Sequence, residues 1–188
     1  MTLKEEILAF VPQNRQEEKD KLELLRWLDS GLDVFSRSCG AAHFTASAWV
    51  VSPDRKQVLM AYHNLYDSWA WLGGHADGEA DLQAVAAREA REESGIREVR
   101  PLTDMPVSLE ILTVDGHEKK GKYVSSHLHL NLTYLFEADM DQALAVKPDE
   151  NSGVAWIPVE EIAVRSTEPW FVERIYSKLC DKVQNMAE

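Results

Sequence analysis

The sequence predicts a domain that mixes helices with strands, of the α/β or α+β class. Two observations support this prediction. Residues 123–138 alternate apolar and polar side chains, as strands do, whereas residues 82–94 carry apolar side chains at the helical period. The chain has 188 residues, of which 45% are hydrophobic, so it is long enough for one domain with an ample core.

The N-terminal part of the chain is predicted to be helical. Residues 3–11 predict a short helix, and Asn14, followed three residues later by Glu17, predicts the start of a second one. We expect residues 1–40 to form a helical segment that packs on a domain comprising residues 41–188. Two other roles of this segment stay open, a cover over a substrate cleft and a homodimer contact.

Strands and loops are predicted to alternate through most of the remaining chain. The predicted strands are residues 43–51, 57–63, 69–72, 97–102, 107–114, 123–138 and 154–157. Residues 115–122 are expected to be a polar loop, and residues 139–151 an acidic one. A final helix over residues 169–186 is expected to turn Trp170 and Leu179 towards the core.

The most informative stretch is residues 73–96, in which two glycines lead into a helix with an unusual face. At the helical period, an apolar stripe continues directly into Glu89 and Glu93, with Glu92 at its edge. A buried carboxylate without a compensating charge is very costly. Arg88 reaches Glu92 at the i,i+4 spacing, and a divalent cation with oxygen ligands would compensate better. Taken alone, the arginine–glutamate run also suits a solvated helix, but the glycine loop before it favours a site.

This stretch resembles the Nudix box, which is written Gly, five residues, Glu, seven residues, Arg-Glu-aliphatic-x-Glu-Glu-x-Gly-aliphatic. Gly74 opens the box here, and residues 88–96 fall in register through Ile96. Trp69 and the glycine pair resemble the usual approach to the box, Trp-x-Leu-Pro-Gly-Gly. Agreement over so many positions makes a chance match a poor explanation.

The sequence departs from the box at two positions. Ala80 stands where the box has its first Glu, although Glu79 and Asp81 flank it and could bring a carboxylate to the same place. Leu72 rather than Pro precedes Gly73, which affects only the stiffness of the loop. The first departure puts the efficiency of the site in question more than its activity.

The resemblance implies an α/β/α sandwich, with a mixed sheet between helical layers. It also implies an enzyme that hydrolyses a diphosphate linkage, typically in a nucleoside diphosphate joined to another group. Glu92 and Glu93 would bind Mg²⁺, with Mn²⁺ as a substitute, and Glu89 would be a further ligand or the general base. Arg88 would orient a glutamate, and the backbone of Gly73 would complete the metal shell.

Substrate contacts are expected beside the box. The backbone of Gly74 could hold phosphate, and His75 beside it could contact phosphate or lie in solvent. The strand predicted over residues 123–138 has one polar face, which is either solvated or lines the catalytic cleft. The resemblance favours the cleft, because related chains often carry a His-x-His-x-polar strand here, with His129 and Asn131 as the candidates. The spacing of two histidines on this strand also suits a transition metal, but no further ligand is evident.

Accessory residues are expected outside the box as well. Glu79 and Glu150 are candidate accessory acids, and an exposed position for either is the alternative. Tyr66, Trp71 and Trp170 could stack on a base, although packing is the simpler role for each of them.

Composition limits the partners. The formal net charge of −12 argues against nucleic acid as the main partner, but it allows a phosphorylated small molecule when metal ions screen the carboxylates. No apolar run is long enough to span a membrane, and the first ten residues do not resemble a secretory signal. Cys39 and Cys180 lie far apart in the sequence, so a reduced, cytoplasmic setting is expected.

Two other functions stay open. The first is a module of the Nudix fold that binds a nucleotide-like ligand without turning it over, which Ala80 favours and the intact box glutamates disfavour. The second is isopentenyl-diphosphate isomerase, which shares the fold. It ranks low, because Cys39 and Cys180 both lie outside the predicted sheet, where that enzyme needs a catalytic cysteine.

Overall fold

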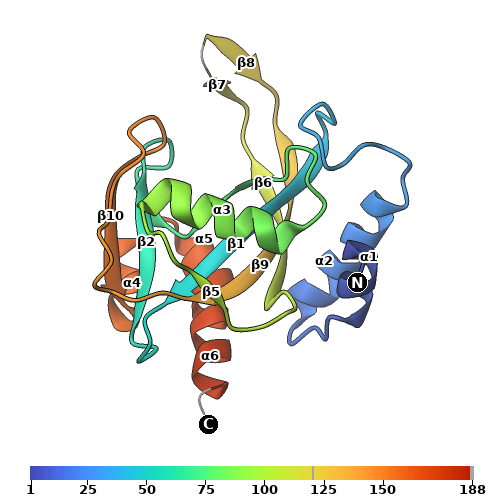
Figure 1. Cartoon of the computed structure of the whole chain (residues 1–188). Helices are drawn as coiled ribbons and strands as arrows, with labels where there is room; N and C mark the ends of the chain where they lie inside the picture. Colours follow the sequence, from blue (N-terminus) through green and yellow to red (C-terminus); the bar gives the residue numbers. More distant parts are fainter. Residues whose placement is uncertain (120, 187–188) are drawn as a thin grey trace.

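A mixed β-sheet forms the centre of the computed structural model, which describes residues 1–119 and 121–186 (Figure 1). The main strand order is β10-β2-β1-β9-β5, and β3, β4 and β6 pair with β2, β1 and β9 respectively. The pair β1–β9 is parallel, whereas the other pairs are antiparallel. The strands of this sheet are β1 (Ala42–Val51), β2 (Gln57–His63), β3 (Ser68–Ala70), β4 (Leu72–His75), β5 (Arg100–Pro101), β6 (Ser108–Val114), β9 (His127–Glu137) and β10 (Asn151–Pro158).

Helices cover both faces of this sheet. In Figure 1, α3 crosses the front of the sheet, α5 lies behind it, α6 extends below it, and α1 and α2 lie together at one side. The helices are α1 (Leu3–Ala9), α2 (Arg15–Leu28), α3 (Leu82–Ser94), α4 (Ile162–Arg165), α5 (Pro169–Phe171) and α6 (Ser177–Asn185). The predicted α/β/α sandwich with a mixed sheet and extra N-terminal helices is therefore confirmed.

Strand β1 connects the two layers of the core. All of its residues are buried, because alternate side chains point to opposite faces of a strand and both faces are covered here. On one face Ala46 and Ala48 pack in the same cluster as Val85 of α3. On the other face Trp49 stacks on Tyr176, with ring centroids 5.5 Å apart.

The N-terminal helices contact the sheet through apolar and charged side chains. Asn14 caps α2 by accepting a hydrogen bond from the backbone amide of Glu17, as predicted. Ile7 and Leu24 are fully buried in the cluster that contains Phe44 of β1.

The carboxylate of Glu17 is also buried, and it links α2 to the C-terminal helix. It lies 2.5 Å from Nζ of Lys182 and 3.2 Å from Nζ of Lys178, and it accepts a hydrogen bond from Ser108.

Three predictions about local structure are wrong. Residues 115–122 were expected to be a loop, but β7 (His117–Lys119) pairs there with β8 (Lys122–Val124), and residue 120 lies outside the described part. This hairpin takes residues 122–124 away from β9, so the long strand begins at His127. The strand predicted over residues 97–102 is shorter than expected, because only the two residues of β5 pair with β9.

The C-terminal helix also differs from the prediction. A π-helical turn over Val172–Tyr176 separates α5 from α6, and a wider turn changes which side chains face inward. Leu179 is buried as expected, but Trp170 is 47% exposed, so the prediction that Trp170 packs into the core is wrong. The neighbouring Phe171 turns towards the cleft described below.

Substitution of Glu17 tests the buried ion pairs. The Glu17→Ala variant should lose about 3–5 kcal/mol of unfolding free energy, because it leaves the buried ammonium groups of Lys178 and Lys182 without their shared carboxylate. Urea denaturation measures this loss. The matched control is Glu18→Ala, an exposed acid in the same helical turn, for which a change within about 0.5 kcal/mol is expected. Equal effects of the two substitutions would contradict this assignment.

Candidate functional site

A cleft of about 1000 Å³ lies where β4, α3, β9 and the loop before β10 meet. The residues that the sequence nominated for catalysis, metal binding and phosphate contacts all line this cleft. These residues are Gly73, Gly74, His75, Glu79, Arg88, Glu89, Glu92, Glu93, His129, Asn131 and Glu150. The fold thus brings together side chains that are up to 77 positions apart in the chain.

The carboxylates of α3 approach the backbone of the glycine pair closely. Glu93 is 6% exposed, and its Oε2 accepts a hydrogen bond of 2.9 Å from the backbone amide of Gly73. At Gly74, an added Cβ would lie 2.5 Å from Cδ of Glu89. Gly74 therefore leaves the space that the Glu89 carboxylate occupies.

Helix α3 holds these carboxylates because both of its ends are fixed. Asp81 accepts a hydrogen bond of 2.9 Å from the backbone amide of Ala84, and Gly95 ends the helix with φ of 77°. Leu82 and Val85 are buried, as the apolar stripe predicts. The buried stripe carries Glu93 inward with it, so the solvated-helix alternative is wrong for this residue.

The charged form of Glu93 is unfavourable in this structure unless a cation lies nearby. Burial raises the pKa of Glu93 to about 8, although its hydrogen bond from Gly73 opposes the shift, and the nearby carboxylates of Glu89 and Glu150 raise it further. Three carboxylates that face one cleft, one of them buried, supply the hard oxygen ligands that a divalent cation such as Mg²⁺ or Mn²⁺ prefers. The residues present therefore fit such an ion.

Arg88 contacts glutamates of its own helix, as the sequence predicts. Its Nη2 donates hydrogen bonds of 2.9 Å to Oε1 of Glu89 and of 3.3 Å to the backbone carbonyl of His75. Its Nε lies 3.9 Å from Oε1 of Glu92. Arg88 thus ties Glu89 to the end of β4.

The sequence analysis missed Lys147. Its ammonium group lies 3.4 Å from Glu92 and 3.0 Å from Glu150, so it sits at the edge of the carboxylates. Asn151 holds this loop in place, because its side-chain amide donates a hydrogen bond of 2.9 Å to the backbone carbonyl of Glu93. The sequence feature that could have identified Lys147 is that it is the single lysine in the acidic loop over residues 139–151.

The two acids beside Ala80 have different positions. Asp81 is the helix cap, whereas Glu79 is exposed and lines the cleft. Glu79 also accepts a hydrogen bond of 2.9 Å from the backbone amide of Asp81. Of the two, Glu79 is therefore the acid that can reach towards the other glutamates.

Asn131 lies in the floor of the cleft, where protein groups surround its side chain. It is 1% exposed, and its amide donates to Glu110 at 3.0 Å and to Thr133 at 3.3 Å. Its oxygen accepts hydrogen bonds from Thr45 at 2.9 Å and from Ser47 at 3.0 Å. At Asn131 and Thr133 the polar face of β9 is therefore buried rather than solvated, whereas His127 and His129 are partly buried.

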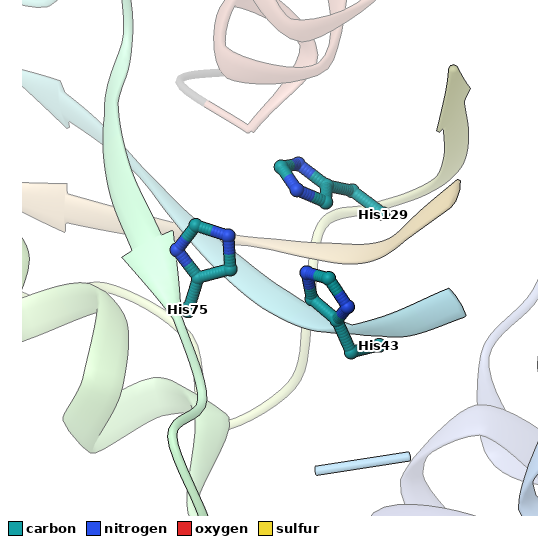
Figure 2. A group of neighbouring side chains, drawn as sticks. All are labelled: His43, His75 and His129. Atoms are coloured by element: carbon teal, nitrogen blue, oxygen red, sulfur yellow. The ribbon is translucent and has the colours of Figure 1, made fainter. Parts of the chain in front are cut away.

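Histidines gather at the end of the cleft that β4, β1 and β9 form. His75 and His129 line it, and Figure 2 shows their rings facing that of His43. The ring of His129 has its centroid 4.9 Å from that of His75 and 5.1 Å from that of His127. Burial and the neighbouring histidines lower the pKa of His129 to about 2, so this ring is neutral. The sequence analysis identified the two histidines of β9, His127 and His129, but missed His43. The pairing of β1 with β9 places His43 beside His129.

Comparisons with known proteins agree with this fold. A family model described as the NUDIX domain matches residues 42–179. An Ap4A hydrolase from C. elegans, solved as a binary complex, has a TM-score of 0.52 and 16% identity over 76% of this chain and 98% of that one. The dihydroneopterin triphosphate pyrophosphohydrolase of E. coli has a TM-score of 0.51 and 14% identity over 71% of this chain and 94% of that one. A search by sequence among curated proteins gives no significant match.

The sandwich, the glycine pair and the helix-borne glutamates define a protein of the Nudix type. The chain belongs to the Nudix family, because the family model covers most of its length. The expectation of a Nudix pyrophosphohydrolase is thereby confirmed at the level of the family. The structural neighbours share too little sequence to add more than the fold.

Two further observations bear on the setting of the protein. Among the described residues, no helix combines the length and the apolar character that crossing a membrane requires. The thiols of Cys39 and Cys180 are both free, so no disulfide joins them.

The two glycines should respond differently to alanine. In Gly74→Ala the new methyl group meets the end of a flexible side chain, so the fold should survive while the displaced Glu89 lowers turnover at least about tenfold. In Gly73→Ala the methyl group meets backbone, 2.6 Å from the carbonyl oxygen of Ala46, so about 1–3 kcal/mol of stability should be lost. Urea denaturation and assays of phosphate release measure the two effects.

Gly40→Ala is the control for this pair, because an added Cβ meets nothing within 4 Å there. It should change neither stability nor turnover. A Gly74→Ala protein with full activity would show that the position of Glu89 does not matter.

Proposed function

We propose that this chain hydrolyses a diphosphate linkage in a small molecule of the nucleoside-diphosphate type, with a divalent cation held by Glu89, Glu92 and Glu93. Mg²⁺ is the proposed cation, and Mn²⁺ a substitute. The backbone of Gly73 and the acids Glu79 and Glu150 are proposed as further groups around this site. The observation that carries the proposal is the convergence of the box carboxylates on the glycine pair, with Glu93 almost fully buried.

The reaction needs a water molecule to attack one phosphorus atom while the bridging oxygen leaves with the other phosphate. A bound divalent cation would supply charge neutralisation of the diphosphate and a more acidic water. Glu89 is placed to accept the proton of the attacking water, because Arg88 fixes its carboxylate through a hydrogen bond of 2.9 Å. Arg88 is therefore a positioning residue, as it contacts glutamates.

Phosphate oxygens have several partners along the cleft. The ammonium group of Lys147 borders the carboxylates and faces the same space. The backbone of Gly74 and the rings of His75 and His129 line the adjoining wall. Asn131 supports this wall from below, since its amide is occupied by protein groups.

The organic part of the substrate fits the aromatic end of the cleft. Tyr66 lines it and is 45% exposed, with its ring 4.5 Å from that of His63. Trp71 lies deeper and packs edge-on against Phe171, with centroids 6.0 Å apart. We infer that Tyr66 stacks on the base, whereas Trp71 shapes the wall. Trp170 is outside this cleft-lining set.

A binding module without turnover is the second candidate function. Ala80 in place of the first box Glu is the observation that favours it. Metal-dependent release of phosphate products separates the two functions, because a module would bind the ligand and leave it intact. The cytoplasmic setting expected from the sequence stays a prediction, and the homodimer contact stays an open alternative.

The direct test of hydrolysis is the substitution Glu93→Gln. Turnover should fall at least about a hundredfold, because the variant removes a charged oxygen ligand, while the fold survives, because a glutamine oxygen still accepts the hydrogen bond from Gly73. The assay measures phosphate products in Mg²⁺ across nucleotide sugars, ADP-ribose, nucleoside triphosphates and coenzyme diphosphates. The panel includes Ap4A and dihydroneopterin triphosphate, for which two structural neighbours are named.

The control for this substitution is Glu98→Gln, an exposed acid four residues beyond the end of α3, which should keep full turnover. Near-normal activity of a folded Glu93→Gln protein would refute the ligand assignment. Intact ligand with tight binding in the wild-type protein would favour the binding module.

The proposed stacking role is tested by Tyr66→Ala. The Michaelis constant for the substrate found in the panel should rise about tenfold with little change in kcat, since the stacking of one base on an aromatic ring contributes about 1–3 kcal/mol. Tyr123→Ala is the control, because Tyr123 is 70% exposed and is not among the cleft-lining residues. Equal kinetics for the two variants would remove Tyr66 from the substrate site.

A further inference from the structure

Four histidines from three neighbouring strands meet on one face of the sheet. His43 lies on β1 and pairs with His129 on the parallel strand β9. His75 ends β4 opposite Thr45, two residues along β1 on the same face. His127 precedes His129 by two residues and so shares its face. These four residues are called the histidine cluster here.

The spacing within the cluster suits a metal ion. One ring nitrogen from each of His43, His75 and His129 lies within 4.8 Å of the other two, and Figure 2 shows the three rings converging. Tetrahedral zinc with Zn–N bonds of about 2.0–2.1 Å holds its nitrogens about 3.4 Å apart. Side-chain rotations that move each ring nitrogen by about 1 Å would bring the three nitrogens to this spacing around an ion.

In His43 and His127, the ring proton lies on Nδ1, so Nε2 carries a lone pair that faces the cluster. Nδ1 of His43 lies 3.2 Å from the backbone carbonyl of Cys39, to which it donates. Nε2 of the same ring then carries a lone pair, and it has no hydrogen-bond partner although His43 is 4% exposed. Likewise, Nδ1 of His127 lies 2.8 Å from the carbonyl of Ser125, so its Nε2 faces the cluster as an acceptor, 3.2 Å from Nε2 of His129. Metal-binding histidines commonly donate their second ring nitrogen to a carbonyl in this way.

The chemistry of the ligands separates this cluster from the glutamates. Neutral imidazole prefers ions such as Zn²⁺, Co²⁺ and Ni²⁺, whereas carboxylates prefer Mg²⁺ and Mn²⁺. Binding of phosphate by protonated imidazoles is the other chemistry that the cluster suggests. It is disfavoured, because the charges would lie about 5 Å apart in a largely buried place.

We propose that His43, His75 and His129 bind one transition-metal ion of the zinc class, with His127 or an oxygen from the cleft as fourth ligand. If the three histidines are the only protein ligands, the fourth coordination position would face the cleft, which His75 and His129 line. This site is separate from the proposed Mg²⁺ site, so neither proposal depends on the other.

Titration with Co²⁺ in excess Mg²⁺ tests the site, because the excess occupies the carboxylates. Four-coordinate Co²⁺ absorbs strongly in the visible, whereas six-coordinate Co²⁺ among oxygens absorbs weakly. The wild-type protein should develop the strong bands with one Co²⁺ per chain, and Zn²⁺ should abolish them. His43→Gln and His129→Gln should each weaken Co²⁺ binding at least about a hundredfold. His63→Gln, a cleft-lining histidine outside the cluster, and Glu93→Gln should both keep the bands.

Several results would overturn the proposal. These are absence of the bands in the wild-type protein, their persistence in both His43→Gln and His129→Gln, and their loss in Glu93→Gln. Binding of inorganic phosphate that depends on His43 and excludes Zn²⁺ would overturn it in favour of an anion site. NMR of the histidine rings in the wild-type protein gives a readout without any variant. Zn²⁺ should shift the ring nitrogens of His43, His75 and His129 and leave those of His63 unchanged.

Discussion

The structure depends on the contact between two carboxylates of α3 and the bare backbone of Gly73 and Gly74. Glu93 accepts the amide of the first glycine, and Glu89 fills the space that a side chain on the second would occupy. Helix α3 must therefore pack against β4 at a fixed distance and with a fixed rotation about its own axis. Its capped ends and its apolar stripe hold it in that position. Burial of a carboxylate costs free energy, and a divalent cation would offset that cost.

The face of the sheet opposite α3 carries buried polar groups. Glu110 receives hydrogen bonds from Asn131 and lies 3.1 Å from Lys178, whose ammonium group also contacts Glu17. Buried polar groups are tolerated only when they are paired, so this chain of contacts joins the terminal helices to the floor of the cleft. The same face ends in the histidine cluster, where the groups are imidazoles and the pairing is incomplete at His43.

Local periodicity and the box spacing predicted that Glu89, Glu92 and Glu93 share one site, and all three line the cleft. The helical stripe placed Glu89 and Glu93 correctly, because packing of one helix face decides which side chains turn inward. The sequence could not predict His43 beside His129, because that contact depends on the register of two strands 86 positions apart. It missed Lys147 for a similar reason, since a loop position is set by the hydrogen bond of Asn151 to the end of α3.

Location of bound Mn²⁺ by anomalous diffraction from a crystal grown in excess of this ion tests the central claim directly. The claim predicts an anomalous peak among the carboxylates of Glu89, Glu92 and Glu93, beside the glycine pair. A protein that binds Mn²⁺ only elsewhere, or leaves these carboxylates without it at saturating concentration, would contradict the claim that they form the metal site.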